Sequence, residues 1–242
     1  MGPGPVPRGA QLTPVWHPSP NFGPRRDGAV PDMVVLHYTA MDCAEKARDW
    51  LCNSDAQVSA HYVIAPRGTV WQLVDEADRA WHAGAGAWGA VTDVNSHSIG
   101  IEISNSGGTP FAAPQMDALD DLLSGILERH AIPPERVIGH SDMAPGRKID
   151  PGRRFDWQRL ARQGLAIWPE AKGQGDFFEN AKRFGYTAQA PEDTLLHCFR
   201  MRFRPWADGP LDHTDTALMA NLAQRWPVSD DPASLGEKYL GV

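Results

Sequence analysis

Short apolar runs that alternate with a longer helical pattern are the feature that most limits the fold of this chain. The runs include Met33 to Leu36, Ser98 to Ser104 and the segment "ERVIGH", which ends at His140. Runs of this length are typical of buried strands. Residues 113–132 place leucines and isoleucines at helical spacing, so this helix would cover one face of a sheet. Strands with helices interleaved predict an α/β or α+β layered domain over residues 12–168.

The pattern changes on both sides of this region. Residues 1–31 are rich in proline and glycine, and we expect them to lie extended over the surface. The stretches "DFFENAKRFGY", "EDTLLHCFRMRFRP" and "DHTDTALMANLAQRW" show no strand alternation and predict a helical module over residues 175–242. A module of this length is near the lower limit for independent folding. We therefore expect it to dock on the larger domain or to depend on a tight core of Phe178, Leu196, Phe199, Phe203 and Leu218.

Charge and cysteine content exclude several classes of protein. The 242-residue chain has a net charge of −7 without a long acidic run, whereas a nucleic-acid binder needs a basic face. No run approaches the ~20 apolar residues of a membrane span, and no signal-peptide core is present. The three cysteines are an odd number, which favours reduced thiols. We expect a cytoplasmic protein, or a periplasmic or cell-envelope protein if a leader is missing from the sequence.

Two histidines and one aspartate predict a metal site. His37 and His140 both end predicted strands, where side chains face a loop-lined surface. Asp150 follows ten residues after His140, in a loop that contains Pro145 and Pro151. A return of this loop would bring the carboxylate beside both imidazoles. Two neutral imidazoles and one carboxylate leave the fourth position of tetrahedral zinc open for water, which is a catalytic arrangement.

Simpler explanations exist for each of these residues. A single histidine more often satisfies a core or surface role than it binds metal. Asp150 before Pro151 could be a turn residue. A structural zinc site that uses Cys43 and Cys52 is disfavoured, because eight residues and a predicted helix separate them where closed sites have a much shorter spacing.

Six ordered motifs carry a family resemblance. They are "VVLHYTA", "SAHYVI", "GTVWQLV", "AWHAGAGAWG", "VNSHSIGIEISN" and "IGHSDMAPGRKIDPG", and they span about residues 15–168. Together they resemble the type 2 N-acetylmuramoyl-L-alanine amidase family, most closely its AmpD-like branch. The resemblance implies a mixed central β-sheet flanked by helices. It also implies hydrolysis of the amide that joins the lactyl group of N-acetylmuramic acid to L-alanine of the peptidoglycan stem peptide.

The resemblance also implies a set of site residues. One zinc ion per chain would be held by His37, His140 and Asp150, with Glu102 and Lys148 as catalytic residues. Glu102 would act as base toward water and as acid toward the leaving amine. Lys148 would stabilise the developing oxyanion. The alternatives are that Glu102 is a buried ion-pair partner and that Lys148 is simply solvated.

Further residues are predicted to contact substrate. Trp81 and His82, in "AWHAG", match the family's substrate groove, although Trp81 could equally be a core residue. Arg147 could bind a substrate carboxylate or be exposed. We expect His61 to support the fold or the metal ligands and not to bind metal. Ala60 stands where the phage-lysozyme branch has tyrosine, so the acid/base role falls to Glu102.

The C-terminal stretch resembles the three-helix peptidoglycan-binding module. The predicted partners are therefore peptidoglycan fragments or muropeptides, with no nucleic acid and no membrane span, and we expect a monomer. The competing hypothesis is a peptidoglycan recognition protein of the same fold, which binds without cleaving because a metal ligand has been lost. All three ligand positions are filled in this sequence, which favours the enzyme, and a recycling role would act on anhydro-muropeptides.

Overall fold

The computed structural model describes residues 13–228. Its strands are β1 (Val15–Trp16), β2 (Phe22–Pro24), β3 (Met33–Tyr38), β4 (Tyr62–Ile64), β5 (Val70–Gln72), β6 (Asp78–Ala80), β7 (Ser98–Ile103) and β8 (Val137–Gly139). Its α-helices are α1 (Ala44–Leu51), α2 (Val94–His97), α3 (Ala113–Arg129), α4 (His140–Met143), α5 (Trp157–Arg162), α6 (Phe177–Phe184), α7 (Glu192–Phe203) and α8 (His213–Arg225).

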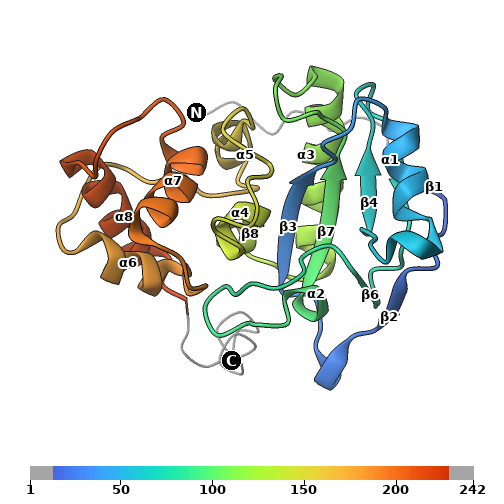
Figure 1. Ribbon diagram of the computed structural model, residues 1–242, viewed down its shortest axis with the longest axis horizontal. Coiled ribbons are helices and arrows are strands. Elements are labelled where there is room, and N and C mark those ends of the chain that lie inside the picture. The colour runs from blue at the N-terminus through green and yellow to red at the C-terminus, as the bar shows by residue number, and fades with distance from the viewer. Residues whose placement is uncertain (1–12, 229–242) are drawn as a thin grey trace, which may run out of the picture.

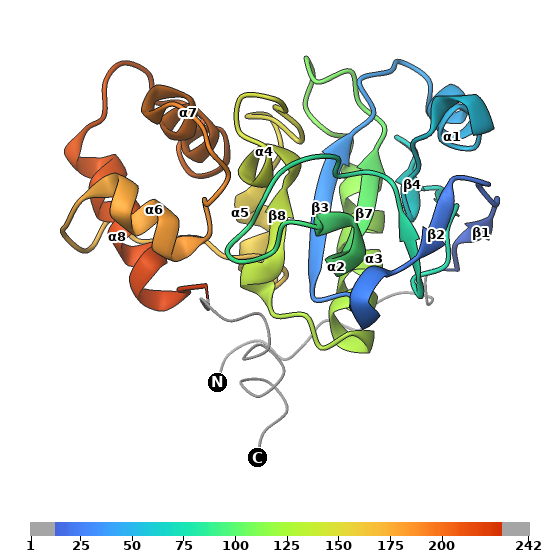
Figure 2. The ribbon, with the colours of Figure 1, turned by 60° about the horizontal axis from the view of Figure 1, so that its bottom comes forward.

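A six-stranded sheet in the order β1-β5-β4-β7-β3-β8 forms the centre of the molecule. Strands β4, β7, β3 and β8 are parallel, whereas β5 pairs antiparallel with β4 and parallel with β1. Figures 1 and 2 show α3 on one face of this sheet and α2, with the loop before it, on the other. The predicted fold class, a mixed central sheet flanked by helices, is confirmed.

The central strand β3 divides its side chains between the two faces of the sheet. Val34 and Leu36 are fully buried in the apolar cluster that includes the inner side of α3. Met33 and Val35 belong to a different cluster on the opposite face. Because successive side chains of a strand alternate, His37 lies on the same face as Met33 and Val35, away from α3.

The neighbouring strand β7 follows the same rule. Its three isoleucines pack into the cluster that contains α3. Ser98, Gly100 and Glu102 therefore lie on the face that carries His37. The face toward α3 is packed with apolar side chains, whereas the other face carries polar groups beside Met33 and Val35.

An apolar cluster on this second face continues from the sheet into the C-terminal helices. It includes Met33 in β3, Ile138 in β8 and Met143 in α4, together with Phe199 in α7 and Leu222 in α8. Figure 1 shows α6, α7 and α8 gathered beyond the end of the sheet where β8 lies. These helices are the ones that the sequence predicted after residue 168. The division into a catalytic domain and a helical module stays a prediction.

No helix within residues 13–228 is long and apolar enough to cross a bilayer. Cys43, Cys52 and Cys198 form no disulfide bond in the structure.

Glu76, between β5 and β6, connects the sheet to the end of α3. Its Oε1 accepts hydrogen bonds from the hydroxyl of Tyr62 at 2.7 Å and from Nη2 of Arg129 at 2.6 Å. Its Oε2 lies 2.7 Å from Nε2 of His130. Burial opposes ionisation of the carboxyl, but these hydrogen bonds outweigh it and lower the pKa of Glu76 to about 2.

We expect Glu76→Gln to lower the free energy of unfolding by about 2–3 kcal/mol at pH 7, because the charge-dependent hydrogen bonds are lost. The native pKa of Glu76 lies below its unfolded value, so its contribution is present above the unfolded pKa and is lost as pH falls toward 2. Urea unfolding at pH 7 and pH 3 measures this: the difference from the wild type should shrink at pH 3. Asp121→Asn, an exposed change on α3, should be nearly neutral at both values.

Candidate metal centre and active site

A cleft of about 540 Å³ opens at the carboxyl ends of β3 and β7. Strand register places its polar groups, because His37 pairs with Glu102, and Leu36 pairs with Gly139 directly before His140. All the residues that the sequence predicted for the site line this cleft: His37, Trp81, His82, Glu102, His140, Arg147, Lys148 and Asp150.

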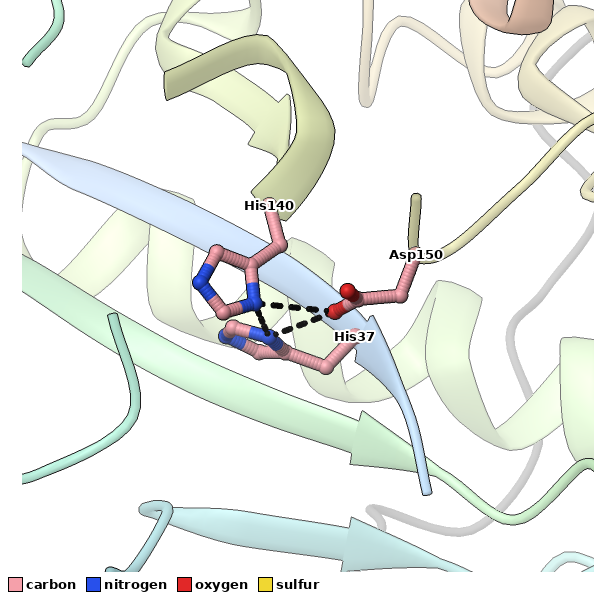
Figure 3. Close-up of side chains that lie close together, drawn as sticks. All are labelled: His37, His140 and Asp150. Atoms are coloured by element: carbon pink, nitrogen blue, oxygen red, sulfur yellow. Dashed lines mark hydrogen bonds and ion pairs between the residues drawn. The ribbon is translucent and has the colours of Figure 1, made fainter. Parts of the chain in front are cut away.

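Three donor atoms converge in this cleft (Figure 3). Nδ1 of His37 lies 2.9 Å from Nδ1 of His140 and 2.9 Å from Oδ2 of Asp150. The distance from Nδ1 of His140 to Oδ2 of Asp150 is 3.0 Å. All three side chains are buried, and together they could hold a metal ion. Donors around tetrahedral zinc lie about 3.3 Å apart, so this spacing is close to the required one.

The segment after α4 turns back to place the aspartate. The backbone N–H of Lys148 donates to the carbonyl of Ala144 at 3.0 Å, which closes a turn. The N–H of Ser141 then donates to the carbonyl of Asp150 at 2.9 Å. This bond fixes Asp150 beside the first turn of α4, which begins with His140. The return of the loop that the sequence suggested is therefore present.

The outward nitrogen of each imidazole determines which nitrogen faces the donors. Nε2 of His140 lies 2.8 Å from the carbonyl of Ala83. A carbonyl can only accept a hydrogen bond, so Nε2 carries the proton. Nδ1 of neutral His140 is therefore unprotonated and directs its lone pair at His37 and Asp150.

A chain of hydrogen bonds sets the tautomer of His37 in the same way. The hydroxyl of Ser98 donates its proton to the carbonyl of Val94, so Ser98 Oγ accepts from Nε2 of His82, which lies 3.2 Å away. Nδ1 of His82 is then an acceptor for Nε2–H of His37 at 3.0 Å. Nδ1 of His37 is left without a proton. His82 thus contacts a metal-site histidine, and both of its ring nitrogens are used within the protein.

The protonation of the two imidazoles shows whether the three donor atoms fit a metal ion. Three acceptor atoms without a proton face one another, so their lone pairs repel unless a cation lies among them. Burial, with the nearby His140, lowers the pKa of His37 to about 4 and keeps the ring neutral, as a metal ligand must be. Two imidazoles and one carboxylate are a donor set of catalytic zinc. The residues present therefore fit this ion.

A glycine makes room for the chain of hydrogen bonds. A Cβ atom at Gly100 would lie 2.4 Å from Cγ of His82, so no larger residue allows the ring to rest on β7. The N–H of Gly100 donates to Nδ1 of His61 at 3.0 Å, and Nε2 of His61 lies 3.1 Å from the carbonyl of Asp78. His61 is buried and bound to backbone groups, which agrees with the expected supporting role.

Glu102 provides a proton-carrying group beside the three donors. Its Oε2 is buried and has no hydrogen-bond partner within residues 13–228. Burial and the negative charge of Asp150 raise the pKa of Glu102 to about 8, although the charge of Lys148 opposes them. The carboxyl can therefore both hold and release a proton near neutral pH. The absence of a partner for this oxygen in the described part of the chain argues against the alternative of a buried structural carboxylate.

The two basic residues of the loop are placed differently. Nη2 of Arg147 donates to the carbonyls of Ala83 and Ala85, and it lies 3.4 Å from Nε2 of His140. Lys148 lies near enough to Glu102 to influence the pKa of that carboxyl. Lys148 thus brings a positive charge into the neighbourhood of Glu102.

Apolar side chains form part of the cleft wall and were not predicted from the sequence. Trp50 in α1 is 54% exposed and Ile149 is 56% exposed, and both line the cleft with Met41 and Val58. Large exposed apolar groups around a polar site are typical of ligand-binding surfaces. Only their exposure distinguishes them from core residues, and exposure cannot be read from residue type.

Two imidazoles with unprotonated Nδ1 atoms and a carboxylate converge beside a protonatable acid, and this arrangement fits the class of metal-dependent hydrolases. Comparison with known proteins specifies which kind. The chain belongs to the N-acetylmuramoyl-L-alanine amidase family, whose profile matches residues 27–153. This confirms the resemblance found in the sequence motifs.

Two named amidases are similar to this chain over different lengths. The N-acetylmuramoyl-L-alanine amidase AmiD of Escherichia coli K12 is 35% identical over an alignment of 232 positions, and the alignment covers 80% of this chain and 83% of that protein. The 1,6-anhydro-N-acetylmuramyl-L-alanine amidase AmpD of Haemophilus influenzae is 41% identical over 104 residues, which cover 43% of this chain and 56% of that protein.

Solved structures agree with the fold. The complex of Escherichia coli AmiD with anhydro-N-acetylmuramic acid-L-Ala-D-γ-Glu-L-Lys has a TM-score of 0.74 at 34% identity, and the match covers 83% of this chain and 92% of that chain. AmpDh3 of Pseudomonas aeruginosa, in complex with anhydromuramic pentapeptide, has a TM-score of 0.72 at 32% identity. That match covers 88% of this chain and 96% of the AmpDh3 chain.

Proposed function

We propose that this protein is a zinc-dependent N-acetylmuramoyl-L-alanine amidase. Its substrates would be muropeptides, including the anhydro form, in which an amide joins N-acetylmuramic acid to L-alanine. The observation that carries the proposal is the convergence of three unprotonated donors beside Glu102. Family membership supports the reaction, and the related structures that contain anhydromuramoyl peptides support the substrate class.

The donor set would hold one zinc ion through His37, His140 and Asp150. Zinc bound at such a site lowers the pKa of water and polarises a carbonyl group. The chain itself contributes the rigid placement of the donors. Backbone carbonyls, His82 and Ser98 fix the imidazole tautomers before any ion arrives.

Glu102 would transfer the proton that amide hydrolysis requires. Its carboxylate takes a proton from the attacking water as the new C–O bond forms. Its carboxylic acid then gives that proton to the nitrogen of L-alanine as the C–N bond breaks. A group with a pKa of about 8 is suited to both roles near neutral pH.

The remaining cleft residues would stabilise and position the substrate. Lys148 would place a positive charge beside the oxyanion that develops on the lactyl carbonyl. Trp81 would offer an aromatic surface to the sugar or peptide. Arg147 would present its remaining donors to a stem-peptide carboxylate. Both ring nitrogens of His82 are already hydrogen-bonded within the protein, so His82 would contact substrate only through its ring carbons.

The alternative is a peptidoglycan recognition protein that binds the same ligands without cleaving them. Such a protein does not need a complete donor set or a buried proton carrier. Both are present here, so we favour the enzyme. We also infer a cytoplasmic location and a monomeric state, which cell fractionation and sedimentation would test.

Mass spectrometry of reaction products tests the proposed activity. The zinc-loaded protein is incubated with a soluble 1,6-anhydro-muramoyl peptide and, separately, with intact peptidoglycan sacculi. We expect free stem peptide from the soluble substrate, loss of release after chelation, and recovery when zinc is returned. Release from sacculi as well would indicate a broader wall amidase. Binding of the soluble peptide without release, in the zinc-loaded protein, would instead establish the recognition function.

A further inference from the structure

The C-terminal helices contact the part of the chain that carries a metal ligand. We propose that these helices hold His140 in its metal-binding position, and that Arg202 and Tyr186 are positioning residues of the metal centre. The helical region would then be a working part of the active site and not only a wall-binding attachment. This inference rests on the proposed zinc-dependent function.

The first connection is a buried ion pair between α7 and α4. Nη1 of Arg202 donates to Oδ2 of Asp142 at 2.6 Å, and these side chains are 2% and 1% exposed. Nη2 of the same arginine donates to the carbonyl of Val137 in β8 at 2.9 Å. The guanidinium also lies 4.3 Å from the ring centroid of Trp157. Arg202 therefore binds both the strand before His140 and the helix that begins with it.

A tyrosine donates a further hydrogen bond to Asp142. The hydroxyl of Tyr186, just after α6, donates to Oδ1 of Asp142 at 2.7 Å. Oδ2 of Asp142 also accepts from the N–H of Gly139 at 2.8 Å, which ties the carboxylate to the start of α4. Asp142 lies two residues after His140 in a single-turn helix. Such a short helix has little stability of its own, so its orientation depends on these tertiary contacts.

The second connection holds the hydrogen-bond partner of His140. The loop that begins at Ala83 carries the carbonyl bound by Nε2 of His140. Farther along this loop, the N–H of Gly89 donates to the carbonyl of Gly185 at 3.0 Å, and Thr187 Oγ1 donates to the carbonyl of Gly89 at 2.7 Å. The segment after α6 thus fixes the loop that orients the imidazole.

Aromatic packing reinforces this second connection. Trp88, which is 1% exposed, packs edge-to-face against Phe184 and Tyr186 at centroid distances of 5.3 and 5.1 Å. A Cβ atom at Gly185 would lie 2.4 Å from this indole, so glycine is required for the close approach. The backbone and the outward nitrogen of His140 are therefore both held through the C-terminal region.

Helix α7 provides a matched control for this proposal. Arg200 is also buried, and it pairs with Asp215, with side chains 5% and 0% exposed. Its other hydrogen bonds go to the carbonyls of Gly209 and Pro210, which also lie in the C-terminal region. Arg200→Met should therefore destabilise the helices too, although less than Arg202→Met, because Asp215 keeps its ion pair with Nη1 of Arg204 at 2.6 Å whereas Asp142 loses its arginine partner. Only Arg202→Met removes a contact with α4.

The test is zinc affinity of the full chain, measured by competition with a chromophoric chelator, together with thermal unfolding. We expect Arg202→Met to bind zinc about 10-fold more weakly than the wild type, as found when the outer contacts of metal ligands are removed. Arg200→Met should also lower Tm, but its zinc affinity should stay within about twofold of the wild type. Amidase activity of Arg202→Met should recover at saturating zinc.

Tyr186→Phe gives a second, milder variant in case Arg202→Met does not fold. It removes one hydroxyl, and we expect a smaller decrease in zinc affinity, by about 2- to 5-fold. Equal zinc affinity in the wild type and in each folded variant would overturn the proposal while leaving the amidase function intact. A wild-type protein that binds no zinc would overturn both.

Discussion

Replacing Glu102 by glutamine is expected to lower kcat by about 10²- to 10⁴-fold while zinc binding is retained. Glutamine has nearly the same shape but cannot take a proton from water or give one to the leaving amine. The measurement is kcat on a soluble anhydro-muramoyl peptide, with zinc content determined on the same sample. Glu45→Gln, an exposed change on α1, is the control and should have no effect. Turnover of Glu102→Gln within a factor of three of the wild type would remove Glu102 from the mechanism.

Glu102→Gln should lower activity but raise the stability of the metal-free protein. Burial raises the native pKa of Glu102 to about 8, above its unfolded value, so ionisation weakens the metal-free fold. The cost begins as pH rises above the unfolded pKa and is complete above about pH 8. Metal-free Glu102→Gln should therefore be more stable than the wild type by about 3 kcal/mol at pH 8, with no gain near pH 4. Such a trade of stability for activity is common at active sites.

Asp150→Asn should abolish activity at limiting zinc through loss of the metal. The carboxylate is the one anionic donor of the set, and an amide oxygen lacks its charge. We expect zinc affinity to fall by more than about 100-fold, because changes to mere outer contacts of ligands already cost 10- to 100-fold. Chelator competition measures the affinity directly.

Asp208→Asn is the matched control for this substitution. It removes a carboxylate that is 85% exposed and lies far along the chain in the C-terminal region, so zinc affinity should be unchanged. Zinc binding by Asp150→Asn within twofold of the wild type would show that Asp150 is not a ligand.

Much of the metal centre could be predicted from sequence because its determinants are local. His37 and His140 follow short apolar runs, and parallel strands bring their carboxyl ends to one edge of the sheet. Alternation along β7 also fixes the face on which Glu102 lies. The stiff loop that carries Asp150 is only ten residues from His140, so few closures are possible.

The contacts that support the ligands could not be predicted in this way. Arg202 and Asp142 are 60 residues apart, and neither differs in type from a surface residue. Whether these two side chains meet depends on how the helices pack beyond the end of the sheet, and no local sequence pattern encodes that packing. The hydrogen bond between His82 and His37 likewise depends on Gly100, because a side chain at this position would collide with the ring of His82. The short strands β1 and β2 were missed because their proline-rich segment has no alternating pattern.

The two-faced character of β3 links metal uptake to correct folding. A shift of β3 by one residue against β7 would turn His37 toward α3 and bring Val34 and Leu36 to the cleft. A molecule with this error would lack one of the converging donors, whatever its helix content. The zinc-to-protein ratio of a refolded sample would therefore report the fraction of chains with native strand register, which circular dichroism cannot distinguish.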